Sequence, residues 1–391
     1  MYYKIINRKK KVFTVIADLF GYILWMPVNL FKKKNIPFAD IKEILVIRTA
    51  YIGDVVMTLP ILKSLKTLYP DARITFLTSS SAGDVFLNNP YVDSILTYQA
   101  FWFYPLNLKE AIRNYLKFLK VLRSKTYDLT IEARADIRDI LLLAYMSKSR
   151  HRVSYKVGGG GYLLTNVVPY ERTKHRIEYH RDIVRYLGGN NNTIEWGLYL
   201  SPEEQNAADS LLLHEGVDFT GLLVGIHPGS RKELKTWFPD RFAKLADTII
   251  TEYGAQVIFT GSQEEKEFID GILVQMDHAV INLAGKTDVR TLSGIIEKFD
   301  LFICNDSAPL HIASAMKTPT VAIFGPSKSL ETGPYGNVHR VVEKDFPCRF
   351  SCDEDVCKHR VYKECMKKIV VRDVMEAVRT ITREMRKMTK R

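Results

Sequence analysis

The chain has 391 residues, 46% of them hydrophobic, which is enough for two domains of ordinary size with a core in each. Its formal net charge of +12 favours anionic partners such as nucleotide phosphates, phosphorylated glycolipids or a membrane surface. The basic residues gather at the two ends, and no zinc-finger, RNA-binding or helix-turn-helix pattern lies between them, so we expect no nucleic-acid partner.

The N-terminal segment 1–40 is basic and apolar. Residues 12–31 are nearly apolar, contain Asp18 and are flanked by lysines. The run only just reaches the roughly 20 residues of a spanning helix, and it lacks the cleavage site of a secretory signal. An amphipathic helix in the membrane interface fits better than a spanning helix or one packed on the protein's own surface. We therefore expect residues 8–34 to associate with a membrane surface.

Residues 41–200 alternate between short apolar runs and helical patterns, which predicts a first domain with a mostly parallel sheet. The predicted strands are 43–48, 73–78, 92–98 and 129–132, and the predicted helices are 55–68 and 109–125. The pattern breaks over residues 154–176, which we interpret as loops. Gly158 to Gly161 lie there without the strand-then-helix context of a phosphate loop and indicate a flexible turn.

A second alternating stretch, 222–370, follows a linker predicted at 201–221. Its predicted strands are 222–227, 256–260, 280–283, 301–304 and 320–324, and its helices are 240–253, 264–276, 289–299 and 308–316. Residues 371–391 are predicted to form an amphipathic helix that packs back on the first domain, with a basic tail. The predicted fold class is α/β, with two Rossmann-like domains facing each other across a cleft that gathers the ligand-binding loops.

The first strand is followed by a turn that ends in Gly53 and Asp54. A dinucleotide fingerprint would place G-x-G-x-x-G here, and its absence counts against a dehydrogenase. Asp54 stands at the start of a helix. It is there either to cap free backbone N–H groups or to act as general base for an incoming hydroxyl.

Two loops of the second domain carry groups that suit an anion. After His227, the small residues Gly229 and Ser230 let backbone amides approach a phosphate, and Arg231 and Lys235 add positive charge.

The other loop follows the strand that ends at Cys304. Asp306, Ser307 and Pro309 suit the start of a helix, whose free N–H groups form a site for a diphosphate. His311 fits either a packed helix position or a ligand role. A carboxylate base on one domain and phosphate-binding loops on the other are the groups that glycosyl transfer needs.

Four cysteines, Cys348, Cys352, Cys357 and Cys365, lie close together near the C-terminus. Structural zinc favours tighter pairs, and disulfides are not expected in a reducing cytoplasm. Reduced thiols, a metal site and redox-dependent pairing remain open for this cluster. We interpret Cys304 as a core residue.

Over residues 44–381 the sequence resembles the heptosyltransferase family, glycosyltransferase family 9. The segments that carry the likeness are IRTAYIGDVVMTLPIL, HPGSRKELKTWFPDRFAKLAD, FTGSQEEKEF, NLAGKTDVRTLSGII and CNDSAPLHIASAMKTPTVAIFGPS, followed by GPYG. The resemblance implies a GT-B enzyme that needs no metal or cofactor. It would transfer heptose, or a related sugar, with inversion from an ADP-activated donor to a lipopolysaccharide core or similar glycolipid. Its expected location is peripheral, on the cytoplasmic face of the inner membrane. A sugar-nucleotide epimerase and a non-catalytic sugar-nucleotide-binding protein are the alternatives.

The resemblance also implies roles for matching residues. It makes Asp54 the catalytic base and Lys235 the second catalytic residue, at the donor phosphates. The other implied donor contacts are Ser230, Glu264 near the ribose, the backbone around Arg290 and Thr291 at the adenine, Asp306 at the heptose hydroxyls, and Ser307, Ala308 and His311 at the phosphates. The acceptor-side residues are Gly53, Asp136 and His175. The chain departs from the family at Ser307-Ala308, where Thr-Gly is usual, and in 132–136, where a glycine is usual.

Overall fold

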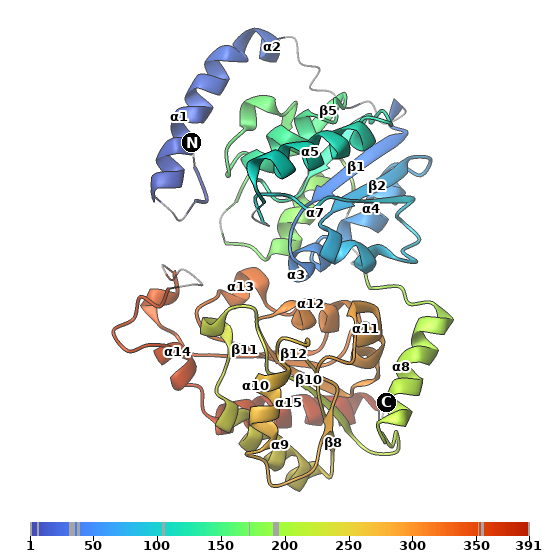
Figure 1. Cartoon of the computed structure of the whole chain (residues 1–391), viewed down its shortest axis with the longest axis vertical. Helices are drawn as coiled ribbons and strands as arrows, with labels where there is room; N and C mark the ends of the chain where they lie inside the picture. Colours follow the sequence, from blue (N-terminus) through green and yellow to red (C-terminus); the bar gives the residue numbers. More distant parts are fainter. Residues whose placement is uncertain are drawn as a thin grey trace. The chain divides into compact units, whose positions relative to one another are not determined.

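The computed structural model describes residues 2–5, 8–30, 36, 40–103, 106–171, 173–190, 195–350, 352 and 356–389. The chain forms two compact units that divide between Trp196 and Gly197. Each unit contains one parallel sheet flanked by helices (Figure 1). The prediction of a linker at 201–221 is corrected, because this segment belongs to the second unit and contains helix α8 (Pro202–His214).

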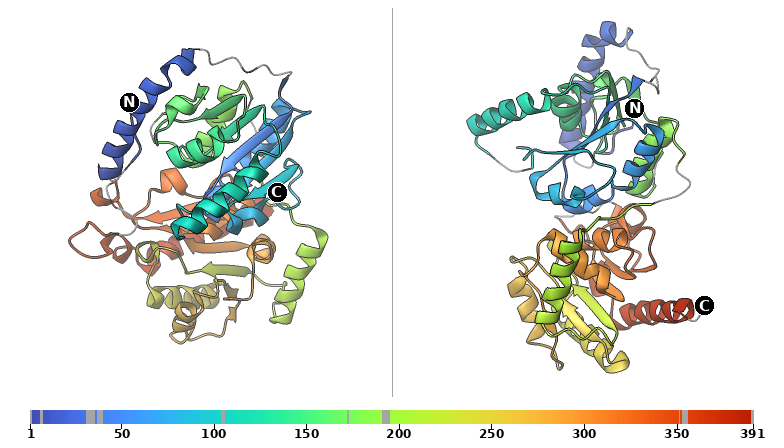
Figure 2. Two further views of the ribbon diagram at one scale, coloured as in Figure 1. Left: turned by 45° about the horizontal axis from the view of Figure 1, so that its top comes forward. Right: turned by 90° about the vertical axis from the view of Figure 1, so that its right-hand side faces the viewer.

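The first unit is built on a six-stranded sheet with the order β3-β2-β1-β4-β5-β6. The order reverses at β1, so the crossovers place helices on both faces of the sheet (Figure 2). Its strands are β1 (Glu43–Arg48), β2 (Arg73–Thr78), β3 (Ser94–Thr97), β4 (Leu129–Glu132), β5 (His151–Ser154) and β6 (Asn166–Val167). Its helices and helical turns are α1 (Arg8–Leu24), α2 (Met26–Leu30), α3 (Ile52–Val56), α4 (Pro60–Leu68), η2 (Ser80–Phe86), α5 (Leu108–Leu122), α6 (Ile137–Asp139), η3 (Ile140–Tyr145), η4 (Gly161–Leu163) and α7 (Arg176–Tyr186).

Within this unit β1, β2 and β4 have the predicted bounds, and β3 and α5 are shorter than the predicted 92–98 and 109–125. Two other regions differ from the prediction in kind. The single helix predicted over 55–68 is divided into α3 and α4, because Pro60 starts a new helix and has no N–H to continue the old one. The region 154–176, interpreted as loops, contains the end of β5 and the two-residue strand β6. Both strands are too short for a periodic signal.

The second unit repeats the arrangement with the order β12-β11-β10-β7-β8-β9, again all parallel. Its strands are β7 (Leu223–His227), β8 (Gln256–Phe259), β9 (Ile281–Asn282), β10 (Leu301–Asn305), β11 (Thr320–Phe324) and β12 (His339–Glu343). Its helices and helical turns are α8, η5 (Glu233–Lys235), α9 (Pro239–Tyr253), α10 (Lys266–Leu273), α11 (Val289–Lys298), α12 (Ala308–Ala315), α13 (Ser329–Thr332), η6 (Pro347–Phe350), α14 (Glu364–Lys367) and α15 (Val371–Thr389).

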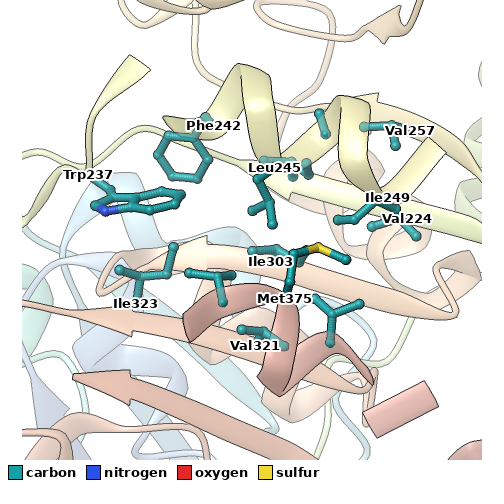
Figure 3. Packing of buried hydrophobic residues seen from close by; sticks show 14 of the residues in the cluster. Val224, Trp237, Phe242, Leu245, Ile249, Val257, Ile303, Val321, Ile323 and Met375 are labelled. Atoms are coloured by element: carbon teal, nitrogen blue, oxygen red, sulfur yellow. The ribbon is translucent and has the colours of Figure 1, made fainter. Parts of the chain in front are cut away.

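The core of the second unit shows where the last helix packs (Figure 3). Ile303 of β10 lies against Leu245 of α9, and Val321 of β11 and Met375 of α15 belong to the same cluster. Helix α15 therefore uses its apolar face in its own unit, against α9, β11 and β12. The prediction that it packs back on the first domain is wrong.

The N-terminal segment forms the helices α1 and α2 and belongs to the first unit. Among the described residues no helix combines the length and the apolar character that crossing a membrane requires. The predicted membrane-associating segment 8–34 also includes residues 31–34, which lie outside the described residues.

Candidate active site

Asp54 lies beyond the carboxyl end of β1, in the first turn of α3. The N-cap residue of that helix is Tyr51, so helix capping does not explain Asp54. Its carboxylate contacts two guanidinium groups instead: Nη2 of Arg48 lies 3.1 Å from Oδ1, and Nη1 of Arg176 donates to the same oxygen. The Asp54 side chain keeps 25% of its surface exposed, which leaves it open to an incoming hydroxyl group.

The two arginines differ in how they are held. Arg48 is buried and donates from Nη1 to the Ala133 carbonyl oxygen at 2.8 Å, and burial lowers the pKa of its guanidinium. Arg176 is the first residue of α7, and 37% of its side chain is exposed. The sequence analysis did not predict either arginine. Arg176 comes from a helix 122 residues further along the chain, so no local pattern connects it with Asp54.

Two further carboxylates, Glu132 and Asp139, are buried in the first unit near the turn that follows β1. Glu132 ends β4 and accepts a hydrogen bond of 2.6 Å from the Ser154 hydroxyl. Asp139 accepts one of 2.5 Å from the hydroxyl of Thr49, the residue after Arg48. Burial, with the charge of Asp139 nearby, raises the pKa of Glu132 to about 8, and burial raises the pKa of Asp139 to about 6.

The turn after Glu132 contains a residue in an unfavourable backbone conformation. Ala135 has a φ of 60°, in the left-handed region that favours glycine. The Glu132 carboxylate stabilises the turn by accepting hydrogen bonds from the N–H groups of Arg134 and Ala135, at 2.9 and 2.8 Å. The left-handed residue thus lies in the stretch 132–136, where the resemblance leads us to expect a glycine.

The three predicted acceptor-side residues lie in different elements of the first unit. Gly53 is buried in α3 immediately before Asp54. His175 is the N-cap of α7, since its Nδ1 accepts from the Ile177 N–H at 3.2 Å, and it precedes Arg176. The first and last of the predicted set, Gly53 and His175, are therefore sequence neighbours of the Asp54–Arg176 ion pair.

Asp136, the remaining acceptor-side candidate, caps α6 and pairs with arginines. It accepts from the backbone N–H of Arg138 at 2.9 Å and from its side chain at 2.6 and 2.8 Å, and Arg134 lies 3.4 Å away. Burial opposes ionisation of Asp136, but these arginine contacts lower its pKa overall. Arg134 also stacks on the ring of Phe103, 4.3 Å from its centroid, so the turn presents cations beside an aromatic ring.

In the second unit, the predicted donor residues Lys235 and Asp306 form an ion pair. Nζ of Lys235 lies 2.9 Å from Oδ2 of Asp306, and the two side chains are 13% and 5% exposed. Ser230 Oγ donates to the Asp306 carbonyl oxygen at 3.3 Å. The structure therefore brings together three of the residues that the sequence placed at the donor.

Asn305 holds these two loops against each other. It ends β10, which pairs with β7, so the loops after the two strands leave the same edge of the sheet. Its Nδ2 donates to the Pro228 carbonyl at 2.6 Å, and its Oδ1 accepts from the Trp237 N–H at 3.2 Å. Trp237 is buried in the core, which fixes the far end of the loop. Sequence reasoning passed over Asn305, although it stands directly before Asp306.

A carboxylate that the sequence analysis did not select lies against the first donor loop. Oε2 of Glu265 is 3.6 Å from Nε2 of the buried His227, and burial lowers the pKa of this histidine. A Cβ at Gly229 would lie 2.0 Å from Oε1 of Glu265, so the absence of a side chain at Gly229 lets this carboxylate lie close to the loop. The predicted residue, Glu264, is the exposed neighbour of Glu265. The sequence signal for Glu265 is the spacing Ser262-x-x-Glu265, which is that of a capping box. In the structure Oε2 of Glu265 accepts a hydrogen bond of 2.8 Å from the Ser262 N–H.

The predicted adenine contacts, Arg290 and Thr291, lie in the first turn of α11. The Arg290 side chain is buried and makes a two-pronged ion pair with Glu204 of α8, at 2.6 and 2.8 Å. The Thr291 N–H donates to the cap residue Asp288 at 2.7 Å. The Arg290–Glu204 pair therefore connects α11 to α8, and the Thr291 N–H belongs to the N-terminal cap of α11.

The start of α12 contains the last three predicted donor residues. Ser307 is its N-cap, but the Ser307 hydroxyl donates to the Asn305 carbonyl at 3.4 Å and does not accept from the first turn of the helix. Ala308 follows as the first helical residue, and His311 is buried within the helix. Within this first turn Pro309 has no N–H and the Leu310 N–H donates to the Ser307 carbonyl oxygen at 3.2 Å, so the N–H groups of Ser307 and Ala308 are the ones that suit a phosphate.

The four clustered cysteines line one small pocket together with His359 and Lys363. All are free thiols, and burial raises the pKa of Cys348 and Cys365. Within the part of the chain that the structure describes, no three His, Cys, Asp or Glu side chains are arranged to hold a metal ion. Cys304 is buried in β10, as expected for a core residue.

Comparison with known proteins shows the family to which this chain belongs. Residues 115–362 match the sequence model of glycosyltransferase family 9 (heptosyltransferase). Lipopolysaccharide heptosyltransferase 3 of Escherichia coli K12 is 30% identical over 292 residues, which cover 70% of this chain and 80% of that protein.

Two solved structures show the GT-B fold that the sequence predicted. A family 9 glycosyl transferase from Veillonella parvula has a TM-score of 0.77 and 22% identity, over 90% of this chain and all of that one. The E. coli ADP-heptose LPS heptosyltransferase II has a TM-score of 0.70 and 21% identity, over 88% of this chain and 99% of that one. Residues 115–362, which match the family model, make up more than half of this chain. The chain therefore belongs to glycosyltransferase family 9, the heptosyltransferases.

Proposed function

We propose that this glycosyltransferase transfers heptose from ADP-heptose to a lipopolysaccharide core or a similar glycolipid, with inversion and without a metal ion. The donor follows from the similar E. coli enzyme that is named for ADP-heptose, and the acceptor follows from the lipopolysaccharide enzymes among the relatives. The observation that carries the proposal is the buried ion pair of Lys235 and Asp306 beside the start of α12.

The donor groups of the second unit suit a departing nucleoside diphosphate. The Lys235 ammonium group and the N–H groups of Ser307 and Ala308, at the start of α12, would stabilise the negative charge that develops on the diphosphate as the glycosidic bond breaks. Asp306 keeps Lys235 in place and offers its remaining oxygen to a sugar hydroxyl. Ser230, Ser307 and His311 would complete the phosphate side, and Ala308 would add a methyl group where the family usually has none.

The proposed contacts with the nucleoside are Glu264 at the ribose and the backbone around Arg290 and Thr291 at the adenine. Glu264 is exposed after β8, where it would accept a hydrogen bond from the ribose. Because the Arg290 side chain and the Thr291 N–H are engaged within the unit, any contact of these residues with adenine would use their other backbone groups.

In the first unit, Asp54 would act as general base. Its carboxylate would take the proton of the acceptor hydroxyl while that oxygen attacks the anomeric carbon from the face opposite to the diphosphate, which inverts the configuration. Arg48 holds Asp54 in position from the buried side. Arg176 adds positive charge beside Asp54, and Arg134 and Arg138 add it beside Asp136. This charge suits an anionic glycolipid with acceptor-side contacts at Gly53, Asp136 and His175.

The acceptor class also suggests where the enzyme works. A glycolipid acceptor is presented at a membrane surface, and the basic and apolar segment 8–34 gives this chain a means of staying there. We place the enzyme on the cytoplasmic face of the inner membrane as a peripheral protein.

Donor binding measured by calorimetry tests the proposal. ADP-heptose should bind in preference to UDP-, GDP- and CMP-sugars, and Lys235→Ala should weaken its binding at least tenfold, since a charged hydrogen bond is worth about 1.5–3 kcal/mol. Lys298→Ala, which removes a lysine paired with Asp209 between α11 and α8, is the control and should bind normally. Preference for another nucleotide would reject ADP-heptose as the donor. Conversion of the donor without any acceptor would indicate an epimerase.

A further inference from the structure

Helix α1 is packed with its polar side inward and its apolar side outward. The residues that it buries are Thr14, Asp18 and Gly21, which follow one another at helical spacing. Its large apolar side chains are mostly exposed, and the apolar surface continues into α2. The exposed side chains are Val12, Phe13, Val15, Ile16, Leu19, Phe20, Ile23, Leu24, Met26 and Val28, each with between 41% and 74% of its surface accessible. At 100° per residue, those of α1 cover about half of its circumference.

The buried side of α1 is held by specific polar contacts. Oδ1 of Asp18 accepts from the Gly160 N–H at 2.7 Å, and Oδ2 accepts from the Tyr3 hydroxyl at 2.8 Å. The Asp18 side chain is 2% exposed, so both hydrogen bonds are shielded from water. The helix is thus fixed to the first unit without using its apolar face.

The glycine run Gly158–Gly161 is the surface on which α1 lies. A Cβ at Gly159 would lie 2.4 Å from Cγ2 of Thr14, and one at Gly161 would lie 2.5 Å from the hydroxyl oxygen of Tyr22. Gly159 and Gly160 also have positive φ angles, of 92° and 77°. The run therefore consists of glycines because the helix approaches the backbone closely and the turn requires left-handed residues.

The other side of the glycine run contacts the acceptor-side turn. A Cβ at Gly158 would lie 1.8 Å from the Ala135 carbonyl oxygen, and one at Gly160 would lie 3.3 Å from side-chain atoms of Ile137. Ala135 and Ile137 flank Asp136. The glycine run thus connects α1 to the turn that we assign to the acceptor.

The charge next to the apolar face identifies its partner. Arg8, Lys9, Lys10 and Lys11 form the exposed first turn of α1, and the helix carries one acidic residue, the buried Asp18. An apolar half-cylinder beside a cluster of cations is the pattern of a helix that lies in the headgroup region of an anionic bilayer. Each basic residue near such a surface contributes about 1 kcal/mol to binding. A protein partner would match the apolar face but would not require four consecutive cations.

We infer that the exposed face of α1 and α2 binds an anionic phospholipid bilayer, and that the glycine run fixes this helix beside the acceptor-side turn. The inference deepens the proposed function, on which its second part rests: a helix docked in this way presents the acceptor turn to a lipid-borne acceptor in a defined orientation. Binding to a lipid surface does not depend on which sugar the enzyme transfers.

Vesicle flotation of the full chain tests the lipid surface without any sugar substrate. We expect binding to vesicles of phosphatidylcholine with phosphatidylglycerol, weaker binding to phosphatidylcholine alone, and a decrease as salt concentration rises. The double variant Leu19→Ser/Leu24→Ser should bind at least tenfold more weakly, because two leucines leave the bilayer. The matched control is Leu108→Ser/Leu330→Ser, which changes two equally exposed leucines outside α1 and should bind as the wild type does.

Equal flotation of the α1 variant and the wild type would overturn the inference, as would equal binding to neutral and anionic vesicles. Sedimentation without lipid tests whether a second copy of the chain covers this face instead. If the wild type is a dimer and the Leu19→Ser/Leu24→Ser variant is a monomer, a second copy covers the face and the lipid assignment fails.

Turnover separates this inference from the proposed function. With a water-soluble acceptor fragment the α1 variant should turn over like the wild type, while with a vesicle-bound acceptor its rate should fall at least tenfold. Loss of lipid binding with an unchanged rate on the vesicle-bound acceptor would reject the role in acceptor presentation. Absence of heptosyl transfer by the wild type would instead reject the proposed function and leave the lipid surface standing.

The packing of α1 on the glycine run Gly158–Gly161 can be tested separately. Asp18→Ala removes the acceptor of the Gly160 and Tyr3 hydrogen bonds but leaves the apolar face intact. We expect lipid binding to persist and amide hydrogen exchange in 158–161 to increase at least tenfold. Unchanged exchange would show that α1 is not held there.

Discussion

The ion pair of Lys235 and Asp306 allows the donor site to be tested by stability and by binding at once. Its charged atoms lie 2.9 Å apart, and both side chains are largely buried. Lys235→Met removes the cation but keeps the apolar stem, so the Asp306 carboxylate stays buried without its partner. Breaking a buried pair from one side costs about 3–5 kcal/mol. Because Lys235 is partly exposed, we expect about 3 kcal/mol, on the order of a 100-fold change in the folding equilibrium.

A second substitution separates the structural role from the binding role. Adding Asp306→Asn to Lys235→Met removes the buried charge and should recover about 2 kcal/mol of the loss. Donor binding should remain weak in this double variant, because the cation for the phosphates is still missing. Lys298→Met is the matched control: it breaks a pair of 2.7 Å with Asp209 whose side chains are 31% and 37% exposed, and it should cost less than about 1 kcal/mol.

The assays are urea unfolding, followed by circular dichroism, and calorimetry with ADP. The reasoning would be refuted if Lys235→Met were as stable as the Lys298→Met control. It would also fail if the double variant recovered ADP binding together with its stability.

Two predictions concern the acceptor-side turn. Ala135→Gly should raise the free energy of unfolding by about 0.5–1 kcal/mol in urea titrations, since Ala135 is left-handed. The control Ala207→Gly, at an exposed position inside α8, should lower it by about 1 kcal/mol, and a loss at both sites would contradict the argument. The pKa of Glu132 is raised from 4.5 to about 8, so the folded chain retains a proton that the unfolded chain releases, and stability falls as pH rises between these values. Glu132→Gln should therefore gain stability relative to the wild type from pH 5 to pH 8, and parallel pH profiles would argue against a buried, protonated Glu132.

Much of the fold could be predicted because its central strands are continuous apolar runs. Strands such as β1 and β11 have the predicted bounds, since the four-residue apolar runs ILVI and VAIF, each set off from helical patterns, leave little choice. β12 was not predicted, because its half-exposed residues, with a histidine, an arginine and a glutamate, give no apolar run. The packing of α15 was predicted wrongly because an amphipathic pattern shows that a helix has an apolar face and does not show which surface covers it.

The candidate site divides in the same way. Lys235 and Asp306 could be selected because each stands in a loop directly after a buried strand. Arg176 could not, since its contact with Asp54 depends on how α7 packs against α4, the helix that follows α3. Glu265 was not selected: its spacing from Ser262 is that of a capping box, but this spacing does not show that the carboxylate also lies against Gly229.

The central claim is that Asp54 is the base of a heptosyl transfer, and Asp54→Asn tests it most directly. The substitution keeps the shape of the side chain and an oxygen for Arg48, but an amide does not take a proton from the acceptor hydroxyl. The measurement is single-turnover transfer from ADP-heptose to a soluble acceptor fragment, with ADP-heptose binding measured on the same protein. We predict that transfer falls at least 100-fold while donor binding stays within about twofold of the wild type. Transfer at a near wild-type rate would show that another group is the base.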